Sequence, residues 1–277
     1  MTPQIGVHRS LSYEAYCAID AVRSSHLKGF KRSARHAREQ ILGDTETAAK
    51  TLGQALHVAL LEPNLFSKSY AAAPKVDRRT NIGKNTWAHF QADNAGKIPL
   101  LKEEYDECMA LAEAAHGHPD AVELLSNEKA MREVTLVWQE ANGLYGKARL
   151  DLLTTYRGYS AIVDIKTTRD ASPKWFARDA DTYSYQLQAA WYLRGADALQ
   201  PIPRRYILLA IEKGKPHGVA LYEFDEPFLA DGRRQIEKAL VAYKNATDSG
   251  VWPGYPLGIH TLQAPGWITP DADDTDE

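Results

Sequence analysis

The sequence predicts an α/β fold, a mixed central β-sheet flanked by helices, and two observations carry this prediction. Apolar residues recur with a helical period through most of the first 125 residues, and the period changes to two after residue 133. Strand-like and helix-like segments then alternate, which is typical of a sheet covered by helices. An apolar fraction of 44% in 277 residues suffices for the core of one large domain.

The N-terminal part is expected to be helical. Ser24 can cap the first helix, and Pro63 ends the second. Residues 71–99, rich in Pro, Lys, Arg, Asn and Gly, are predicted to form a long loop or a mobile segment. Four helices are expected in this part, over residues 24–42, 52–62, 100–116 and 119–125.

The second half is expected to supply the sheet. Asn142-Gly143 and residues 156–159 are predicted as hairpin turns between the first three strands. Ser172-Pro173 is a helix start. Strands are expected over 133–138, 144–154, 161–168, 205–211 and 219–224, and the main helices over 182–193, ending at Gly195, and 227–247. We expect one domain over 1–256 with a helical N-terminal part, and a C-terminal extension over 257–277 that ends in a disordered acidic tail.

Composition excludes several classes of protein. No run of 18 apolar residues is present, so no membrane span is expected. The N-terminus lacks the apolar stretch of a signal peptide, so the expected location is cytoplasmic. Two cysteines, in no CxxC setting, argue against a disulfide framework, a structural zinc site and a four-cysteine iron–sulfur cluster.

The net charge of −3 at first argues against a nucleic-acid partner, but charge is unevenly distributed. The last seven residues carry five acidic groups, so the rest of the chain has a net charge of +2. Basic residues cluster at 23–38 and again at 75–84, where Arg78, Arg79 and Lys84 are candidate DNA-binding residues. Each cluster taken alone is better explained as a solvated helix face.

The segments RLD and VDIK carry the strongest chemical pattern. With a turn centred between Arg157 and Gly158, Asp151 and Asp164 are predicted to lie opposite each other. Strand alternation then places Lys166 on the same face. Two close carboxylates repel each other unless a cation lies between them, and oxygen ligands suit Mg²⁺. An Asp–Lys pair on one strand is more often a surface ion pair, but a facing aspartate is unfavourable without a purpose.

Two helical segments add candidate site residues. Gly53 and His57 share one helical face away from the leucine stripe, where the small glycine would allow close approach of another element. Gln188 and Tyr192 are also i, i+4 neighbours, with Tyr185 one turn earlier, and Tyr185 is a further candidate DNA-binding residue. The polar ends of these three side chains are candidates for contact with a phosphate or a metal-bound water. The alternatives are a packed or solvated histidine and an amphipathic helix whose aromatic side chains face the core.

Taken together, these segments resemble a known superfamily. LGxAxHxxLLEP, RLD, VDIKTT followed by DASP, and YxxQxxxY are similar to the PD-(D/E)XK nucleases. Within them the resemblance is to the RecE-type exonuclease domain, that of exodeoxyribonuclease VIII, from about Ser24 to Pro256. It implies a restriction-endonuclease-like core that binds Mg²⁺, for which Mn²⁺ can substitute, and no iron–sulfur cluster.

The resemblance also implies roles for individual residues. His57, Asp151 and Asp164 would bind the metal, together with the backbone carbonyl of Ile165. Lys166 would orient or deprotonate the attacking water, and Gln188 and Tyr192 would act near the scissile phosphate.

Glu133 is the doubtful member of the set. A two-residue turn at Asn142-Gly143 would pair Glu133 with Leu152 and turn it away from Asp151, although a bulge could reverse this. We therefore expect Glu133 to act only indirectly, if at all.

The implied activity is 5′→3′ degradation of double-stranded DNA ends, as in phage recombination, leaving 3′ single strands. The implied assembly is a tetrameric ring, and the implied partner is a single-strand annealing protein. Three alternatives remain open at this point. They are another RecB/Cas4-like nuclease with different polarity or endonuclease activity, a catalytically inactive DNA-binding module, and a non-nuclease α/β protein whose charged strand residues form surface pairs.

Overall fold

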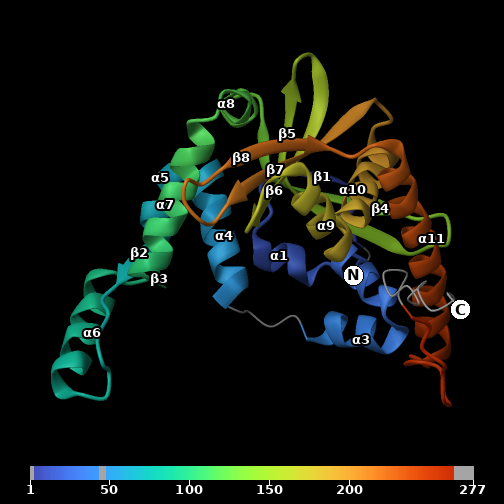
Figure 1. Cartoon of the computed structure of the whole chain (residues 1–277), viewed down its shortest axis with the longest axis horizontal. Coiled ribbons are helices and arrows are strands. Elements are labelled where there is room, and N and C mark those ends of the chain that lie inside the picture. Colours follow the sequence, from blue (N-terminus) through green and yellow to red (C-terminus); the bar gives the residue numbers. More distant parts are fainter. Residues whose placement is uncertain (1–2, 44–47, 265–277) are drawn as a thin grey trace, which may run out of the picture.

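The computed structural model describes residues 3–43 and 48–264 and contains a six-stranded sheet (Figure 1). The strand order is β1-β4-β5-β6-β7-β8, with β6 and β7 parallel and every other neighbouring pair antiparallel. The predicted mixed sheet flanked by helices is therefore confirmed. The strands are β1 (Gly6–His8), β4 (Met131–Gln139), β5 (Tyr145–Tyr156), β6 (Tyr159–Thr168), β7 (Arg204–Glu212) and β8 (Val219–Glu223).

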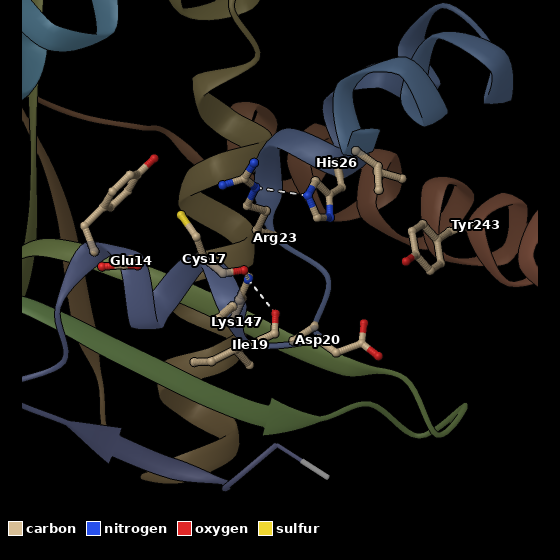
Figure 2. Close-up of a pocket in the computed structure, with 12 residues that line it drawn as sticks. Glu14, Cys17, Ile19, Asp20, Arg23, His26, Lys147 and Tyr243 are labelled. Carbon is tan, nitrogen blue, oxygen red and sulfur yellow. Dashed lines mark hydrogen bonds between the residues drawn. The ribbon is translucent and has the colours of Figure 1, made fainter. Parts of the chain in front are cut away.

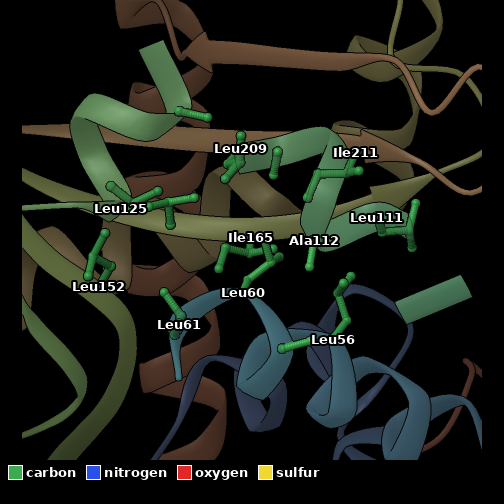
Figure 3. Packing of buried hydrophobic residues seen from close by; sticks show 14 of the residues in the cluster. Leu56, Leu60, Leu61, Leu111, Ala112, Leu125, Leu152, Ile165, Leu209 and Ile211 are labelled. Carbon is green, nitrogen blue, oxygen red and sulfur yellow. The ribbon is translucent and has the colours of Figure 1, made fainter. Parts of the chain in front are cut away.

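Helices cover both faces of this sheet. One apolar cluster joins α4, α7 and α8 to the sheet, and Figure 3 shows Leu60, Leu111 and Leu125 around Ile165 and Leu209. A second cluster joins α10 and α11 to the opposite face. The helices are α1 (Tyr13–Ala18), α2 (Ser24–Lys28), α3 (Ala34–Leu42), α4 (Ala48–Leu61), α5 (Pro63–Ser69), α6 (Asn81–Asp93), α7 (Lys102–His116), α8 (Pro119–Leu125), α9 (Pro173–Thr182), α10 (Tyr185–Leu199) and α11 (Glu226–Ser249).

The helix predicted over 24–42 is two helices. A short 3₁₀ turn, Gly29–Lys31, separates α2 from α3, and the Ser33 hydroxyl caps α3 by accepting from the His36 N–H. A side chain at Gly29 would lie 2.5 Å from the Cα of Ala37, so the glycine allows the chain to fold tightly at this break.

The segment 71–99, predicted as a loop, contains regular structure. Strands β2 (Tyr70–Ala73) and β3 (Ile98–Leu101) form a parallel pair, and α6 lies between them. Thr80 starts α6 by accepting from the Gly83 N–H, and the rings of Trp87 and Phe90 pack one turn apart, 5.3 Å between centroids. The turn-forming residues that suggested a loop lie at the ends of this helix.

Helix α10 continues through Gly195, where an end was predicted. A Cβ on Gly195 would lie 2.4 Å from the Trp138 ring, so this glycine lets α10 approach the sheet closely. It therefore serves packing and not helix termination.

The two hairpins differ in how well they were predicted. Arg157 and Gly158, both with positive φ, form the two-residue turn between β5 and β6 as expected. Between β4 and β5 the loop is one residue longer, because Gln139 pairs with Tyr145 and the Glu140 N–H bonds the Leu144 carbonyl. This register pairs Arg132, and not Glu133, with Leu152.

Two further predictions concern membrane-spanning helices and the acidic tail. Among the described residues, no helix is both long and apolar enough to cross a membrane. The predicted acidic tail at 271–277 lies outside the described residues.

Candidate active site

Four of the predicted site residues, His57, Asp151, Gln188 and Tyr192, line one groove of about 830 Å³. Its lining residues come from helices α1 to α5 and α10 and from strands β2, β4 and β5. Lys28 and Glu133 line it as well.

The inner wall is formed where β5 and β6 separate. Their ladder runs in the predicted register as far as the pair Leu152–Val163, and Asp151 and Asp164 come next on the two strands. Beyond that pair, the Ile165 N–H donates a hydrogen bond to the Asp151 carboxylate at 2.8 Å and not to a backbone carbonyl of β5. Both aspartates are buried, 8% and 2% exposed, so each carboxylate depends on neighbouring groups for its solvation.

One group of ligand-type side chains forms around Asp151. His57 Nδ1 lies 3.5 Å from Asp151 Oδ1 and 3.9 Å from Glu133 Oε1. One ligand atom from each of the three residues lies within 4.8 Å of the others. Helix α4 thus brings His57 to the strands, as its position on the polar face of that helix suggested.

The expectation that Glu133 faces away from Asp151 is wrong. The longer β4–β5 loop shifts the register by one residue, and a one-residue shift moves a strand side chain to the other face. Glu133 also has φ of +51°, which interrupts regular pairing between Arg132 and Val134. Arg149, two residues before Asp151, holds Glu133 in place with an Nε–Oε2 distance of 2.6 Å.

A second group forms around Asp164. Its neighbours Val163 and Ile165 pack into the cluster with α4 and α7, so alternation turns Asp164 toward α10. There the Gln188 amide donates to Asp164 Oδ1 at 2.9 Å and lies 3.2 Å from the Tyr192 hydroxyl. Lys166 Nζ lies 2.5 Å from Asp164 Oδ2.

Lys28 is a site residue that the sequence analysis did not single out. Its ammonium donates to Gln188 Oε1 at 3.1 Å, across 160 residues of sequence. Lys28 and Lys166 both lie against the ring of Tyr185, 5.5 Å and 4.9 Å from its centroid. The only sequence signal was its place in the basic stretch 23–38, which did not distinguish it from its neighbours.

Burial and like charge shift the protonation of this site. Burial raises the pKa of Asp151 to about 6; His57 opposes this increase, and the like charges of Asp164 and Glu133 add to it. Burial also lowers the pKa of Lys28 to about 7, and nearby Lys166 adds to the decrease. Buried carboxylates that repel each other beside an imidazole are a donor set that suits a hard divalent cation. The residues present therefore fit the implied metal.

The basic residues Arg78, Arg79 and Lys84 lie outside this groove. They belong to the segment between β2 and β3, at or near the start of α6. Arg79 bonds Asp77 through Nε at 3.0 Å, and Arg78 stacks on Trp87, 4.6 Å from the ring centroid.

A separate cavity of about 630 Å³ adjoins the groove and shares Tyr13 and Arg23 with it. Figure 2 shows Lys147 beside Cys17 and Ile19 at one wall, and Arg23 bonded to His26 at another. Lys147 Nζ donates to the carbonyls of Tyr16, Cys17 and Ile19 at the end of α1. This buried lysine therefore anchors α1 to β5.

Comparison with known families identifies the family of the chain. Residues 23–263 match the model of a PDDEXK-like domain of unknown function, DUF3799. The chain belongs to this family. The matched range includes Asp151 on β5 and Asp164 and Lys166 on β6.

Solved structures give the same fold. A candidate exonuclease from Eubacterium rectale is similar over 92% of this chain and 96% of its own, with a TM-score of 0.62 and 15% identity. A structure named SSO0001 covers 69% of this chain and 86% of its own at 20% identity, but its TM-score of 0.29 is too low to support an argument. The search of curated proteins finds no match.

Proposed function

We propose that this PDDEXK-like domain is a metal-dependent DNA exonuclease that degrades double-stranded ends from the 5′ side. The supporting observation is the convergence of two buried aspartates, Lys166 and Gln188 at the separation of β5 and β6. The family match supports a nuclease, and the resemblance to RecE-type enzymes supports the polarity and a role in recombination.

We assign the metal to Asp151, Asp164 and His57, together with the Ile165 carbonyl, and we add Glu133 because it faces the same point. Mg²⁺, or Mn²⁺ in its place, would neutralise charge on the phosphate and make water more acidic. The Arg149 guanidinium keeps Glu133 oriented toward His57, so that the carboxylate does not turn into solvent.

The other residues act on the phosphodiester. Lys166, held by Asp164, would donate to a phosphate oxygen and orient the attacking water. Gln188 links Asp164, Tyr192 and Lys28, so it sets the positions of the groups that face the scissile phosphate. In-line attack of water on phosphorus breaks the P–O3′ bond, and the leaving oxygen takes a proton to give a 3′-hydroxyl and a 5′-phosphate.

The resemblance further supports a tetrameric ring and an annealing-protein partner. A ring would keep the enzyme on one DNA end between cleavage steps.

The test is degradation of linear duplex DNA labelled at the 5′ or the 3′ end, with Mg²⁺, with EDTA, and with Asp164→Ala. We expect metal-dependent release of the 5′ label first. Asp164→Ala should decrease the rate by on the order of 10²-fold or more. Release of the 3′ label first would overturn the polarity. Cleavage of closed circles would indicate an endonuclease, and DNA binding without digestion would indicate an inactive binding module.

A further inference from the structure

A basic arm projects from the edge of the active-site groove. We define the arm as residues 74–97, which include α6 and connect β2 to β3. Figure 1 shows α6 at the far end of this segment, away from the central sheet. Within the described chain, α6 makes no extensive contact with any other helix or strand.

The arm is stabilised mainly by contacts among its own residues, with one exposed ion pair to the body, Lys75 Nζ to Glu103 Oε1 at 3.6 Å. Thr80 caps α6, Asp77 bonds the backbone and side chain of Arg79, and Trp87 packs between Phe90 and Arg78. The large aromatic rings are thus engaged within the arm. A helix that stands apart in this way adds little to the core, so its outer surface is the part that another molecule can use.

The outer surface of the arm is basic and polar. The arm carries five Lys or Arg residues against two Asp, a net charge of +3 in a chain of net charge −3. In the described part of the chain no acidic side chain pairs with Arg78 or Lys84, and both are exposed. Ile82 is the one large apolar side chain of α6 that is strongly exposed, at 81%. This surface favours phosphate over a second protein, because protein interfaces are apolar and depleted of lysine at their centres.

The position of the arm relates it to the groove. Tyr70 lines the groove and is the first residue of β2, and the arm begins directly after that strand. A 13-residue helix is roughly 20 Å long, which spans about six base pairs of duplex. DNA that leaves the groove past Tyr70 would therefore run along the arm.

We propose that the arm binds the phosphate backbone of duplex DNA outside the active site, with Arg78 and Lys84 as its main contacts. This proposal rests on the proposed DNA substrate. Because the contacts are to phosphates, the arm holds any duplex sequence and adds affinity for long DNA without touching the scissile bond. A second copy of the chain on the same surface is the competing occupant.

The test compares Arg78→Glu/Lys84→Glu with a matched control, Lys129→Glu/Lys238→Glu. The control makes the same change of charge at two exposed lysines on other elements, the turn before β4 and α11. Binding of a blunt duplex of about 30 bp is measured by fluorescence anisotropy in EDTA, over a range of salt concentrations. Circular dichroism and thermal melting establish that each variant is folded.

We expect the arm variant to lose about tenfold or more in affinity and to show a salt slope smaller by about 2, since roughly one counterion is released per phosphate contact. The control should bind like the wild type. Equal losses in both variants, or none in either, would overturn the proposal. The proposal would also be overturned if the arm variant kept its DNA affinity but changed its molar mass, measured by light scattering. That result would show that the arm binds a second copy of the chain. Because binding is measured without metal, failure of the wild type to digest DNA would count against the nuclease and not against the arm.

Discussion

Glu133 shows how a single residue can be placed by a loop ten residues away. The strand pairing of Glu133 depends on whether the β4–β5 loop has two or three residues. One extra loop residue shifts the register and moves the Glu133 side chain to the other face of the sheet. Its φ of +51° is uncommon for a non-glycine residue, and its carboxylate forms an ion pair with Arg149. A strained acid held beside His57 and Asp151 is better explained as a metal ligand than as a surface charge.

This interpretation predicts the metal dependence of Glu133→Gln. The amide keeps the shape of the side chain and removes its charge, so the Mg²⁺ concentration for half-maximal nuclease activity should rise about tenfold or more. The measurement is a Mg²⁺ titration of activity for Glu133→Gln, the wild type and Glu128→Gln, an exposed control just before β4. Coincident titration curves for all three proteins would show that Glu133 does not bind the metal.

Lys28 allows a prediction of pH-dependent stability. Its pKa falls from 10.5 to about 7 on folding, so between these values the unfolded chain holds a proton that the folded chain has lost. The free energy of unfolding therefore rises with pH from about 7 toward 10.5, and the residue is most destabilising below pH 7.

Lys28→Met should thus stabilise the metal-free protein at pH 6 by on the order of 1–3 kcal/mol and have little effect near pH 10. Urea denaturation in EDTA at the two pH values measures this, with Lys129→Met as the control for loss of an exposed lysine. A gain in stability that is the same at both pH values would contradict a desolvated ammonium at Lys28.

At the scale of elements, two helical glycines have opposite surroundings. A Cβ at Gly195 in α10 would meet the Trp138 ring at 2.4 Å, whereas a Cβ at Gly53 in α4 would have no atom within 4 Å. The expectation that Gly53 permits a close approach is therefore wrong, because its face opens on the groove.

These surroundings predict opposite effects of the same substitution. Gly195→Ala should lower the free energy of unfolding by about 1–3 kcal/mol through overpacking. Gly53→Ala should raise it by about 0.5–1 kcal/mol, as in an ordinary helix interior. Urea denaturation of both variants is the measurement, and each serves as the control for the other. A stabilised Gly195→Ala would show that α10 can move away from the sheet without cost.

At the scale of the whole molecule, the groove gathers acids that repel each other in the absence of metal. Asp151, Asp164 and Glu133 come from three strands that the helix layers press together, so the core maintains an arrangement that is unfavourable by itself. Function and stability therefore oppose each other at this site.

A bound metal ion should relieve the repulsion between these acids and so stabilise the folded protein. Mg²⁺ should raise the melting temperature of the wild type, since it binds only the folded groove, and EDTA should abolish the increase. Asp151→Asn should melt higher than the wild type in EDTA and respond less to Mg²⁺. The measurement is differential scanning calorimetry with Mg²⁺, with Ca²⁺ and with EDTA. A wild type whose melting temperature is the same in all three would argue against a metal site in the groove.

Much of the fold could be predicted because it is encoded locally. The change of hydrophobic period located five of the sheet strands, and helix starts such as Pro119 and Pro173 follow from proline geometry. The two-residue turn at Arg157-Gly158 determined the register that puts Asp151 and Asp164 next to each other. Alternation along β6 places Asp164 and Lys166 on the face opposite to that of Ile165, the core residue between them.

Local sequence patterns thus encode the class of the sheet, its central hairpin and the positions of the aspartates and the lysine on it. Each depends on residues within one turn or one strand, where period and turn chemistry act directly. Only the tertiary structure decided that Glu133 faces Asp151, that Lys28 reaches Gln188 across 160 residues, and that α6 stands apart as an arm. These features depend on loop length and on the packing of distant elements, and no local pattern records either.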